Sequence, residues 1–534
     1  MKPRHFFPLV ACLSVNVCFG QNWPQATGLY DNWSAQTKTV VPNQFNVATG
    51  ENVLWTKPLL EGGQSGIAVW EDRLFLTIFK PYGIDGQQPS KGSTIYALCV
   101  DANSGDILWQ YEITGNNPSN YMYGFSDSTS PTPIADGSHV WFTNASGKVV
   151  CLDWSGELVW ERTWRSVNDV LQPKKKYPFN KQFEPFMVGD TLVNMEPYDS
   201  KDGERTLGWN YLFGLDKKTG AVKWVSEDGL THYNTPGFSK DALGKPTALI
   251  ARGGHHGVPE KPVGYSMIDL SDGSRIWQRE YADIKGSSLY NTGFTKDYAV
   301  WYSETDSKLT LINPQDGSQI RQIDLRSKVD LRTFDEAKGA YVLRKDFNLA
   351  ETENPNVFPA WFTNIIIGEH LYFMCFKDEF VEPMFKKKMK LSPRYAFGRV
   401  NLKTDQVEYL EVPVHIDDAG HYIWQEELKT KAENSRGLSP LPDKRSRRDG
   451  WWWCFNGSPM QVNDNLFFTT MIGNCYTFDT SAEHFEETAF IALNPLGKRG
   501  ESWSLSTPSF ANGKLYHRTM KELICISPNA QPAP

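Results

Sequence analysis

Short apolar runs alternate with tight polar turns, and one arrangement of them repeats along the whole chain. A unit has two apolar strands joined by a tight turn, a third strand ending in Asp or Asn, a glycine turn, and a Trp four residues after the glycine. The clearest copy passes through Asp136-Gly137, Asp153 and Gly156 to Trp160. In such a turn the Asp or Asn accepts backbone N–H groups and the glycine takes a positive φ. The Trp then lies on the outgoing strand, where it covers the face of the next unit.

The position of this Trp predicts a structural anchor between neighbouring units. The same glycine-to-Trp spacing recurs in four copies, and two further copies replace the Trp by Arg321 or Tyr409. Two more copies are irregular, one with an extra residue and one that is longer still. The predicted structural anchors are Trp55, Trp109, Trp160, Trp224, Trp277 and Trp503.

The two ends of the chain indicate how the units are arranged. A four-stranded unit cannot bury both of its faces alone, so the units must stack or close into a ring. The first anchor segment, 45–57, has no strands before it, and the strands between 508 and 527 have no anchor after them. Each end supplies what the other lacks. The pattern therefore predicts an all-β fold, an eight-bladed β-propeller of four-stranded antiparallel blades closed by an N-terminal strand.

Composition supports this fold and excludes several others. The chain has 534 residues, which would suggest three or four ordinary domains, but a repeat fold can use this length as one unit. Hydrophobic residues make up 40% and charged residues 22%, so the chain is neither disordered nor membrane-spanning. Aromatic residues reach 13%, an excess that suits a β-rich fold.

The first twenty residues have the pattern of a secretory signal peptide. Lys2 and Arg4 precede an apolar run over 6–17, and small residues at Cys18 and Gly20 predict cleavage before Gln21. A lipid anchor at Cys12 is the disfavoured alternative, because the apolar stretch before it is short. The predicted divisions are a signal peptide over 1–20, an extension over 21–44, the propeller over 45–528 and a tail over 529–534.

These features place the mature protein outside the cytoplasm, in the periplasm or secreted. No later segment approaches ~18 unbroken apolar residues, so no transmembrane segment is expected. The net charge of −7 becomes −9 when residues 1–20 are removed, because they carry two cations and no anions. An acidic exported protein is a poor candidate for nucleic-acid binding.

The long insertions fall on one side of the predicted ring. The four strands of a propeller blade are called A to D in chain order. The A–B and C–D turns lie on one face of the ring, and the B–C and D–A connections lie on the other. Nearly all the extra length lies in the second class, and the loops expected to build one face are 164–183, 253–262, 326–362, 376–394 and 412–455. Because function concentrates on loops held by a rigid scaffold, this one-sided growth predicts a loop-rich binding face.

Two groups in these connections are the candidate ligand-binding residues. Arg252, His255 and His256 lie in a glycine-rich loop, where the adjacent imidazoles could bind a ligand or simply belong to the loop. A metal site is disfavoured because neighbours in an extended segment point in opposite directions and no nearby carboxylate completes a set. Trp451, Trp452 and Trp453 cannot all face one core, so at least one is expected at the rim or over the channel. Packing between blades is the alternative.

The cysteines read as packing positions. Cys99, Cys151 and Cys525 hold equivalent places in the third strands of three units, where other units have Gly214 or Met267. Small buried side chains, rather than a disulfide framework, fit these places. Cys454 with Cys475 is the one pair for which a disulfide stays open.

The stretches Asp101–Trp109 and Asp216–Trp224 resemble the tryptophan-docking repeat of quinoprotein-like eight-bladed propellers. That family includes pyrroloquinoline quinone (PQQ) dehydrogenases and BamB-like assembly proteins, and the resemblance covers about residues 40–528. The resemblance to the dehydrogenases implies PQQ with calcium, an Asp base and often a disulfide between adjacent cysteines. The chain has no Cys-Cys pair, and the calcium ligands and the base cannot be placed on it residue by residue.

The sequence therefore favours a non-catalytic binding scaffold whose loop-rich face meets a protein or a cell-envelope polymer. A PQQ-dependent oxidoreductase acting on alcohols or sugars is the alternative, and a polysaccharide-active propeller is a remoter one. No catalytic residue and no metal ligand is predicted.

Overall fold

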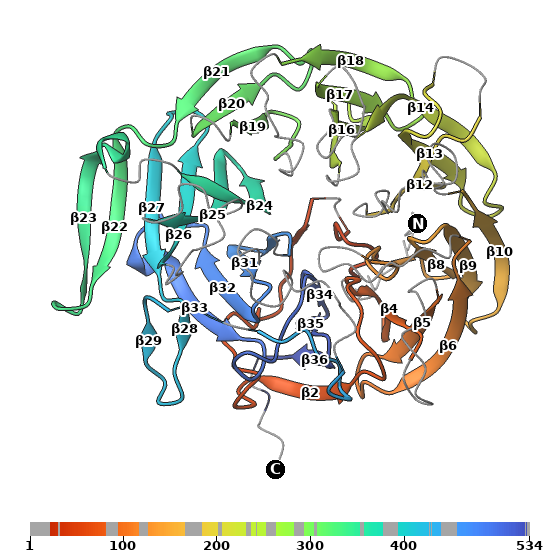
Figure 1. Ribbon diagram of the computed structural model, residues 1–534, viewed down its shortest axis with the longest axis horizontal. Helices are drawn as coiled ribbons and strands as arrows, with labels where there is room; N and C mark the ends of the chain where they lie inside the picture. Colours follow the sequence, from red (N-terminus) through yellow and green to blue (C-terminus); the bar gives the residue numbers. More distant parts are fainter. Residues whose placement is uncertain are drawn as a thin grey trace, which may run out of the picture.

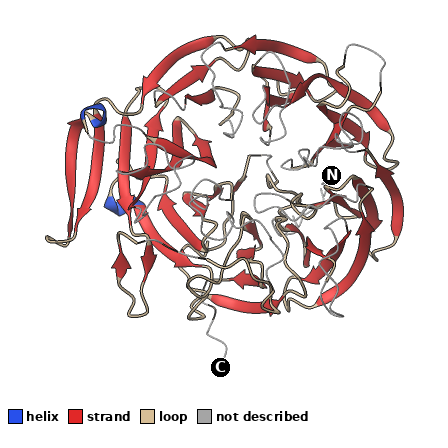
Figure 2. Cartoon of the chain, viewed as in Figure 1, coloured by secondary structure: helices blue, strands red, loops and turns tan. Residues whose placement is uncertain are grey.

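The computed structural model describes residues 22–29, 32–81, 94–116, 127–165, 184–200, 205–230, 236–241, 243–252, 263–281, 293–303, 307–352, 357–377, 394–426, 428, 430–438, 457–528 and 530. The strands form eight antiparallel sheets arranged as blades around a ring, and only two short 3-10 helices, η2 (Leu349–Glu351) and η4 (Glu487–Ala489), occur in this part of the chain (Figures 1 and 2). The predicted eight-bladed β-propeller is confirmed.

Each blade runs from an inner strand near the ring centre to an outer strand at the rim. Blade 1 is β3 (Ala68–Trp70), β4 (Arg73–Phe79), β5 (Thr94–Asp101) and β6 (Ile107–Thr114); blade 2 is β7 (Ile134–Ala135), β8 (His139–Asn144), β9 (Lys148–Asp153) and β10 (Leu158–Thr163). Blade 3 is β11 (Phe186–Val188), β12 (Thr191–Pro197), β13 (Asn210–Asp216) and β14 (Val222–Leu230); blade 4 is β15 (Gly237–Lys240), β16 (Pro246–Arg252), β17 (Gly264–Asp269) and β18 (Arg275–Glu280).

The remaining blades depart further from this plan. Blade 5 is β19 (Ala299–Ser303), β20 (Lys308–Ile312) and β21 (Gln319–Asp324), with an isolated bridge between Phe294 and Ala299 at the inner position. Blade 6 is β24 (Phe358–Ile367), β25 (His370–Lys377), β26 (Arg394–Asn401) and β27 (Val407–Val412); blade 7 is β30 (Met460–Val462), β31 (Asn465–Thr469), β32 (Asn474–Asp479) and β33 (Phe490–Pro495).

Blade 8 closes the ring as the sequence predicts. It is built from β34 (Ser509–Ala511), β35 (Lys514–Arg518) and β36 (Glu522–Ile526), and its outer strand is β2 (Val53–Pro58). β2 pairs antiparallel with β36, with Trp55 opposite Cys525. The first and last strands of the propeller thus share one sheet, so closure joins the two ends of the chain.

The Trp anchors contact the glycine turn of the following blade. A Cβ placed on Gly156 would lie 2.9 Å from the Trp109 ring, and one on Gly220 would lie 2.6 Å from Trp160. Trp109, Trp160 and Trp277 also donate their indole N–H to a backbone carbonyl of the next blade. These glycines have positive φ and no room for a side chain. The indole ring of the Trp therefore packs directly against the backbone of the glycine turn.

The register explains the recurring small residue in the third strand. Cys99 lies opposite Trp109, Cys151 opposite Trp160, and Gly214 opposite Trp224. Trp503 does not share this register, because blade 7 places Ala492 opposite Thr477 and Trp503 follows the end of β33, fully buried. The prediction that Trp503 is an anchor of this type is therefore wrong. Trp503 lies in the connection that follows β33.

The cysteine thiols in the described residues are buried and free. Cys475 is among them and forms no disulfide; Cys454, the other member of the pair left open, lies outside the described residues. Burial raises the pKa of the Cys475 thiol to about 12. The thiols of Cys99 and Cys475 lie in packed regions and serve as small apolar side chains.

The N-terminal extension crosses the ring instead of lying free. Trp23 exchanges backbone hydrogen bonds with Val69 of blade 1, and the Gln25 side chain accepts from the Met187 N–H of blade 3. Further along, Trp33 accepts from the Gln461 N–H of blade 7, and β1 (Ser34–Ala35) pairs in parallel with β30. Blades 3 and 7 are opposite each other in a ring of eight. The N-terminal extension therefore passes across the ring and contacts blades 1 and 3 on one side and blade 7 on the other.

Two of the insertions predicted for the loop-rich face lie partly at the rim. Residues within 326–362 form a hairpin, β22 (Val329–Asp335) and β23 (Ala340–Phe347), and β22 pairs in parallel with β27 at the outer edge of blade 6. Residues within 412–455 form a second small hairpin, β28 (His415–Ile416) and β29 (Tyr422–Ile423). Both hairpins stand outside the ring in Figure 1. These parts were expected on one face of the ring, and that expectation is wrong. The inserted residues of the first hairpin instead extend the sheet of blade 6 at its outer edge.

Candidate functional site

The structure describes only one of the six predicted ligand-binding residues. Arg252 ends β16, and its side chain is buried, which lowers the pKa of its guanidinium. Asp228 and Glu280 act on it electrostatically in the opposite direction. His255, His256, Trp451, Trp452 and Trp453 lie outside the described residues. Arg252 thus points into the packing of blade 4, and no predicted ligand set is assembled in the part of the chain that the structure describes.

A different group of polar residues lies buried between blades 8, 1 and 2. It comes from the connection 59–67 that enters blade 1, the connection 127–133 that enters blade 2, and the ends of β4 and β35. We call these residues the inner polar cluster: Gln64, Ser65, Thr77, Asp127, Thr129 and Arg518. All six are buried, although side chains of this kind usually lie at the surface.

Hydrogen bonds join the two connections of the inner polar cluster. The Thr129 hydroxyl accepts from the Gln64 N–H at 2.8 Å, and the Thr77 hydroxyl donates to the Thr129 carbonyl at 2.9 Å. Next to the cluster, the Gly66 N–H donates to the Thr132 hydroxyl at 3.0 Å. The Ser506 hydroxyl of the connection into blade 8 donates to the Ser65 carbonyl at 2.9 Å. The seam of the ring is therefore held by polar contacts among three blades.

Asp127 and Arg518 carry the charges of the cluster. The Asp127 Oδ1 atom accepts from the backbone N–H and the hydroxyl of Thr129, at 2.7 and 2.5 Å. Arg518 donates from Nη1 to the Thr77 carbonyl at 2.5 Å. The Asp127 Oδ2 atom and the Nε and Nη2 atoms of Arg518 have no hydrogen-bond partner among the described residues. The two groups act on each other electrostatically without forming a direct ion pair.

Burial shifts both groups toward their neutral forms. It raises the pKa of Asp127 to about 7, against the lowering effect of the Thr129 hydrogen bonds and of Arg518. It lowers the pKa of Arg518 to about 9. Removal of a charge from water costs free energy that the available contacts only partly recover. The cluster is thus sensitive to protonation near neutral pH.

Glycine at position 63 makes room for the guanidinium. A Cβ at this position would lie 2.7 Å from the Thr77 carbonyl and 2.9 Å from Arg518 Nη2. The run Gly62-Gly63-Gln64-Ser65-Gly66 is the sequence signal of this close approach, although it reads equally as an ordinary loop. No pattern in the sequence links it to Arg518, because the two meet only when the ring closes.

A strap from the 412–455 insertion is fixed beside this cluster. Residues 430–438 lie against the connection into blade 1, where the buried Glu61 carboxylate accepts from Asn434 and forms an ion pair with Arg436. The Ser435 hydroxyl donates to the Leu59 carbonyl at 2.5 Å. The strap begins at blade 6, so these contacts hold it across blade 7 to the ring seam.

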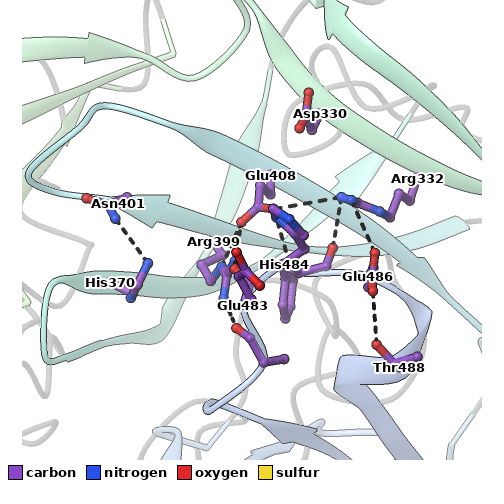
Figure 3. Close-up of polar contacts among 12 residues, drawn as sticks. Asp330, Arg332, His370, Arg399, Asn401, Glu408, Glu483, His484, Glu486 and Thr488 are labelled. Atoms are coloured by element: carbon purple, nitrogen blue, oxygen red, sulfur yellow. Dashed lines mark hydrogen bonds and ion pairs between the residues drawn. The ribbon is translucent and has the colours of Figure 1, made fainter.

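A second buried charge network joins blade 6 to blade 7, where the Trp anchor is missing. Figure 3 shows Arg332 and Arg399 on either side of Glu408. Arg399 donates to the Glu408 carboxylate from Nε at 2.8 Å and to the carbonyls of Ala482 and Glu483, both at 2.7 Å. The Phe485 N–H donates to Glu408 at 3.1 Å. The long C–D connection of blade 7 is therefore docked onto blade 6 by charges instead of an indole ring.

The donors of the inner polar cluster do not fit PQQ with calcium. Calcium takes six to eight oxygen ligands and commonly several carboxylates, whereas the cluster has one carboxylate, Asp127. None of its six residues is aromatic, so it has no ring plane to lie against a quinone. Among the described residues no group of three His, Cys, Asp or Glu side chains is placed to hold a metal ion. The contacts that this cluster makes are those of a polar joint between blades.

Comparisons with known proteins agree with the geometry. Residues 91–298 match a family model described as outer membrane protein assembly factor BamB. The quinohemoprotein alcohol dehydrogenase from Comamonas testosteroni has a similar structure, with a TM-score of 0.54 and 11% identity over 96% of this chain and 82% of that one. The quinohemoprotein alcohol dehydrogenase from Pseudomonas putida HK5 has a TM-score of 0.51 and 12% identity over the same shares. No curated protein matches the sequence.

Identity this low shows the fold alone, and the fold defines the class: an eight-bladed β-propeller with docked blades. The repeats of the chain resemble those of the PQQ-like propellers, and the match over 91–298 agrees with this resemblance. In the described residues, no helix is long and apolar enough to cross a membrane.

Proposed function

We propose that the protein is a non-catalytic binding propeller that presents its connection-rich face to a protein or polymer of the cell envelope. The observation that carries this proposal is the build of the inner polar cluster at the ring seam. The inner polar cluster is occupied by contacts among blades, and its donors do not fit the cofactor of the dehydrogenases. The strap at Glu61 and Arg436 is held firmly in place, as a surface prepared for a partner would be.

The family match supports a partner in the envelope. The matching model is described as an outer membrane protein assembly factor, which is a role in assembling other proteins. An exported protein with a signal peptide over 1–20 would meet such partners in the periplasm or outside the cell. Export and the partner are both parts of the proposal.

The first experiment asks whether the purified protein is a quinoprotein. Its absorbance spectrum and metal content are recorded before and after incubation with PQQ and Ca²⁺, and dye-linked oxidation of alcohols and sugars is measured in parallel. We expect no quinone absorbance, no stoichiometric calcium and no turnover. Oxidation that appears only after PQQ and Ca²⁺ are added would overturn the scaffold role and establish the oxidoreductase alternative.

The second experiment asks which surface binds. Proteins cross-linked to the propeller in envelope fractions are identified, purified and titrated against it. Arg436→Ala, which frees the strap from Glu61, should weaken binding by at least tenfold, and so should joint alanine substitution of Trp451, Trp452 and Trp453. The exposed Lys218→Glu, on a tight turn of blade 3, is the matched control and should bind normally. Equal binding by all variants would refute the proposed face.

A further inference from the structure

The hairpin β22–β23 extends blade 6 beyond its fourth strand. The resulting sheet has the order β23-β22-β27-β26-β25-β24, so β23 forms its outer edge. Figure 1 shows the hairpin standing clear of the ring. β23 has eight residues; its register with β22 is regular over 340–344, roughly 17 Å at the usual rise of a strand, and shifts at a bulge before Phe347. This length is sufficient for an extended peptide to pair along it.

Two other sheets in this molecule, and the sheet of blade 6 itself, are extended by a segment from elsewhere in the chain. β2 adds to β36 at the ring seam, and β1 adds in parallel to β30 of blade 7. β22 itself adds in parallel to β27. A strand edge in this fold is therefore a surface that accepts extended chain, and β23 has no strand on its outer side among the described residues.

The hairpin is held rigidly, so its edge is preformed. Trp424 stacks on Phe334 with ring centroids 3.9 Å apart, and Tyr341 lies edge-on to both rings. The Tyr341 hydroxyl donates to the Glu411 carbonyl of β27 at 2.8 Å. A rigid edge loses little entropy when a partner strand pairs with it.

The charges on β23 indicate what kind of segment fits. Arg344 and Lys345 are consecutive and point to opposite faces of the strand, and Asp346 follows them. Neither cation has an acidic side chain within ion-pair distance among the described residues. Arg344 instead lies over the Phe347 ring. Leu343 of the same strand is 47% exposed and offers an apolar contact. Opposite charges across a strand pair stabilise it, so a partner with acidic residues alternating with apolar ones is complementary.

We propose that the outer edge of β23 binds an acidic, extended segment of a partner protein by strand addition. The backbone of the segment pairs with β23, a carboxylate faces Arg344, and apolar side chains on the opposite face cover Leu343 and the aliphatic part of Lys345. This extends the binding function proposed above by giving the chemistry of the partner segment. It uses neither the connection-rich face nor PQQ, so the two proposals can fail separately.

The test uses the full-length protein and three synthetic ten-residue peptides. The first alternates valine with glutamate, the second alternates valine with lysine, and the third is the glutamate peptide with alternate backbone amides N-methylated. Binding is followed by fluorescence anisotropy, and amide exchange over 340–347 by mass spectrometry. The glutamate peptide should bind and slow exchange in β23, and the other two should bind at least tenfold more weakly.

Charge reversal makes the test specific for β23. The variant Arg344→Glu should lose about tenfold in affinity for the glutamate peptide and gain affinity for the lysine peptide. Lys218→Glu should behave as wild type. Absence of binding, or equal binding by the N-methylated peptide, would overturn strand addition. Protection of 340–347 without peptide, together with a dimer in sedimentation that the reversal abolishes, would assign the edge to a second copy and also overturn the proposal.

Discussion

Asp127 is a carboxyl group that the fold removes from water without giving it a full set of partners. Its Oδ1 atom is held by Thr129, and its Oδ2 atom has no partner among the described residues. Burial therefore outweighs the hydrogen bonds and the nearby Arg518, and the pKa of Asp127 rises to about 7. Such a group links the stability of the ring seam to pH.

The sign of this linkage follows from the direction of the shift. The folded protein holds the Asp127 proton more tightly than the unfolded chain, whose carboxyl has the ordinary pKa of 3.8. The stabilisation from Asp127 is complete below that value and is lost as the pH rises through about 7. Asp127→Asn should remove roughly 2–4 kcal/mol from the difference in unfolding free energy between pH 5 and pH 8.

Urea denaturation at the two pH values measures this difference. Asp106→Asn is the control, because Asp106 is exposed and Lys57 lowers its pKa, so it does not titrate between pH 5 and pH 8. If Asp127→Asn keeps the full wild-type difference, the carboxyl does not titrate as described.

At the scale of the strand, the docking position between blades is filled by different side chains. The indole N–H of Trp160 reaches the Lys217 carbonyl of the next blade, and Arg321 reaches the equivalent Leu402 carbonyl with its guanidinium at 2.5 Å. Arg321 also forms an ion pair with Asp405 at 2.8 Å. A half-exposed ion pair contributes less than a packed ring.

Alanine substitution should therefore rank the docking residues. Trp160→Ala, Trp224→Ala and Trp277→Ala should each lower the unfolding free energy by ~3–5 kcal/mol, because each ring fills the space over the next glycine turn. Arg321→Ala should cost only about 1 kcal/mol. Thermal and denaturant unfolding of the variants measures these losses, and Trp substitutions without effect would show that the repeat does not dock the blades.

The blade 6–blade 7 junction gives a prediction of a different kind. Arg399→Ala should cost ~3–5 kcal/mol, because it leaves the buried Glu408 carboxylate without its main partner. The double variant Arg399→Met, Glu408→Leu should recover most of this loss, because it removes both charges. Unfolding free energies of the wild type, the Arg399→Ala variant and the double variant form the test. A double variant as unstable as Arg399→Ala would mean that the Arg399 bonds to Ala482 and Glu483 dominate.

The repeat made the strands and blades predictable, because a glycine turn and an anchor depend on residues close in sequence. The connections were not predictable in the same way. β22 pairs with β27, and Arg332 reaches Glu408, across about 80 residues of chain. The inner polar cluster combines residues from both ends of the ring, so no local pattern contains it. Trp503 was misassigned because an indole near the right spacing looks the same whether it faces a glycine turn or a connection.

At the scale of the whole molecule, the ring is closed in two places by its N-terminal part. β2 completes blade 8 from the outside, and the segment from Trp23 to Ala35 spans the ring from blade 1 to blade 7. The two closures contribute different contacts to the ring. β2 supplies a whole strand and the Trp55 anchor, whereas the crossing segment supplies hydrogen bonds to inner strands that are already paired.

Two deletions separate these closures. Removal of residues 22–57 takes away β2 and should abolish the single cooperative unfolding transition, because blade 8 loses its outer strand and the contact of Trp55 with Gly105. Removal of residues 22–44 keeps β2 and should leave one cooperative transition at a lower Tm, since the buried Trp23 alone accounts for ~3–5 kcal/mol. Calorimetry and near-ultraviolet circular dichroism distinguish the two outcomes. If the protein without residues 22–57 melts as the full chain does, the strand β2 does not close the ring; if both deletions lose cooperativity, the crossing segment is as necessary to closure as the strand.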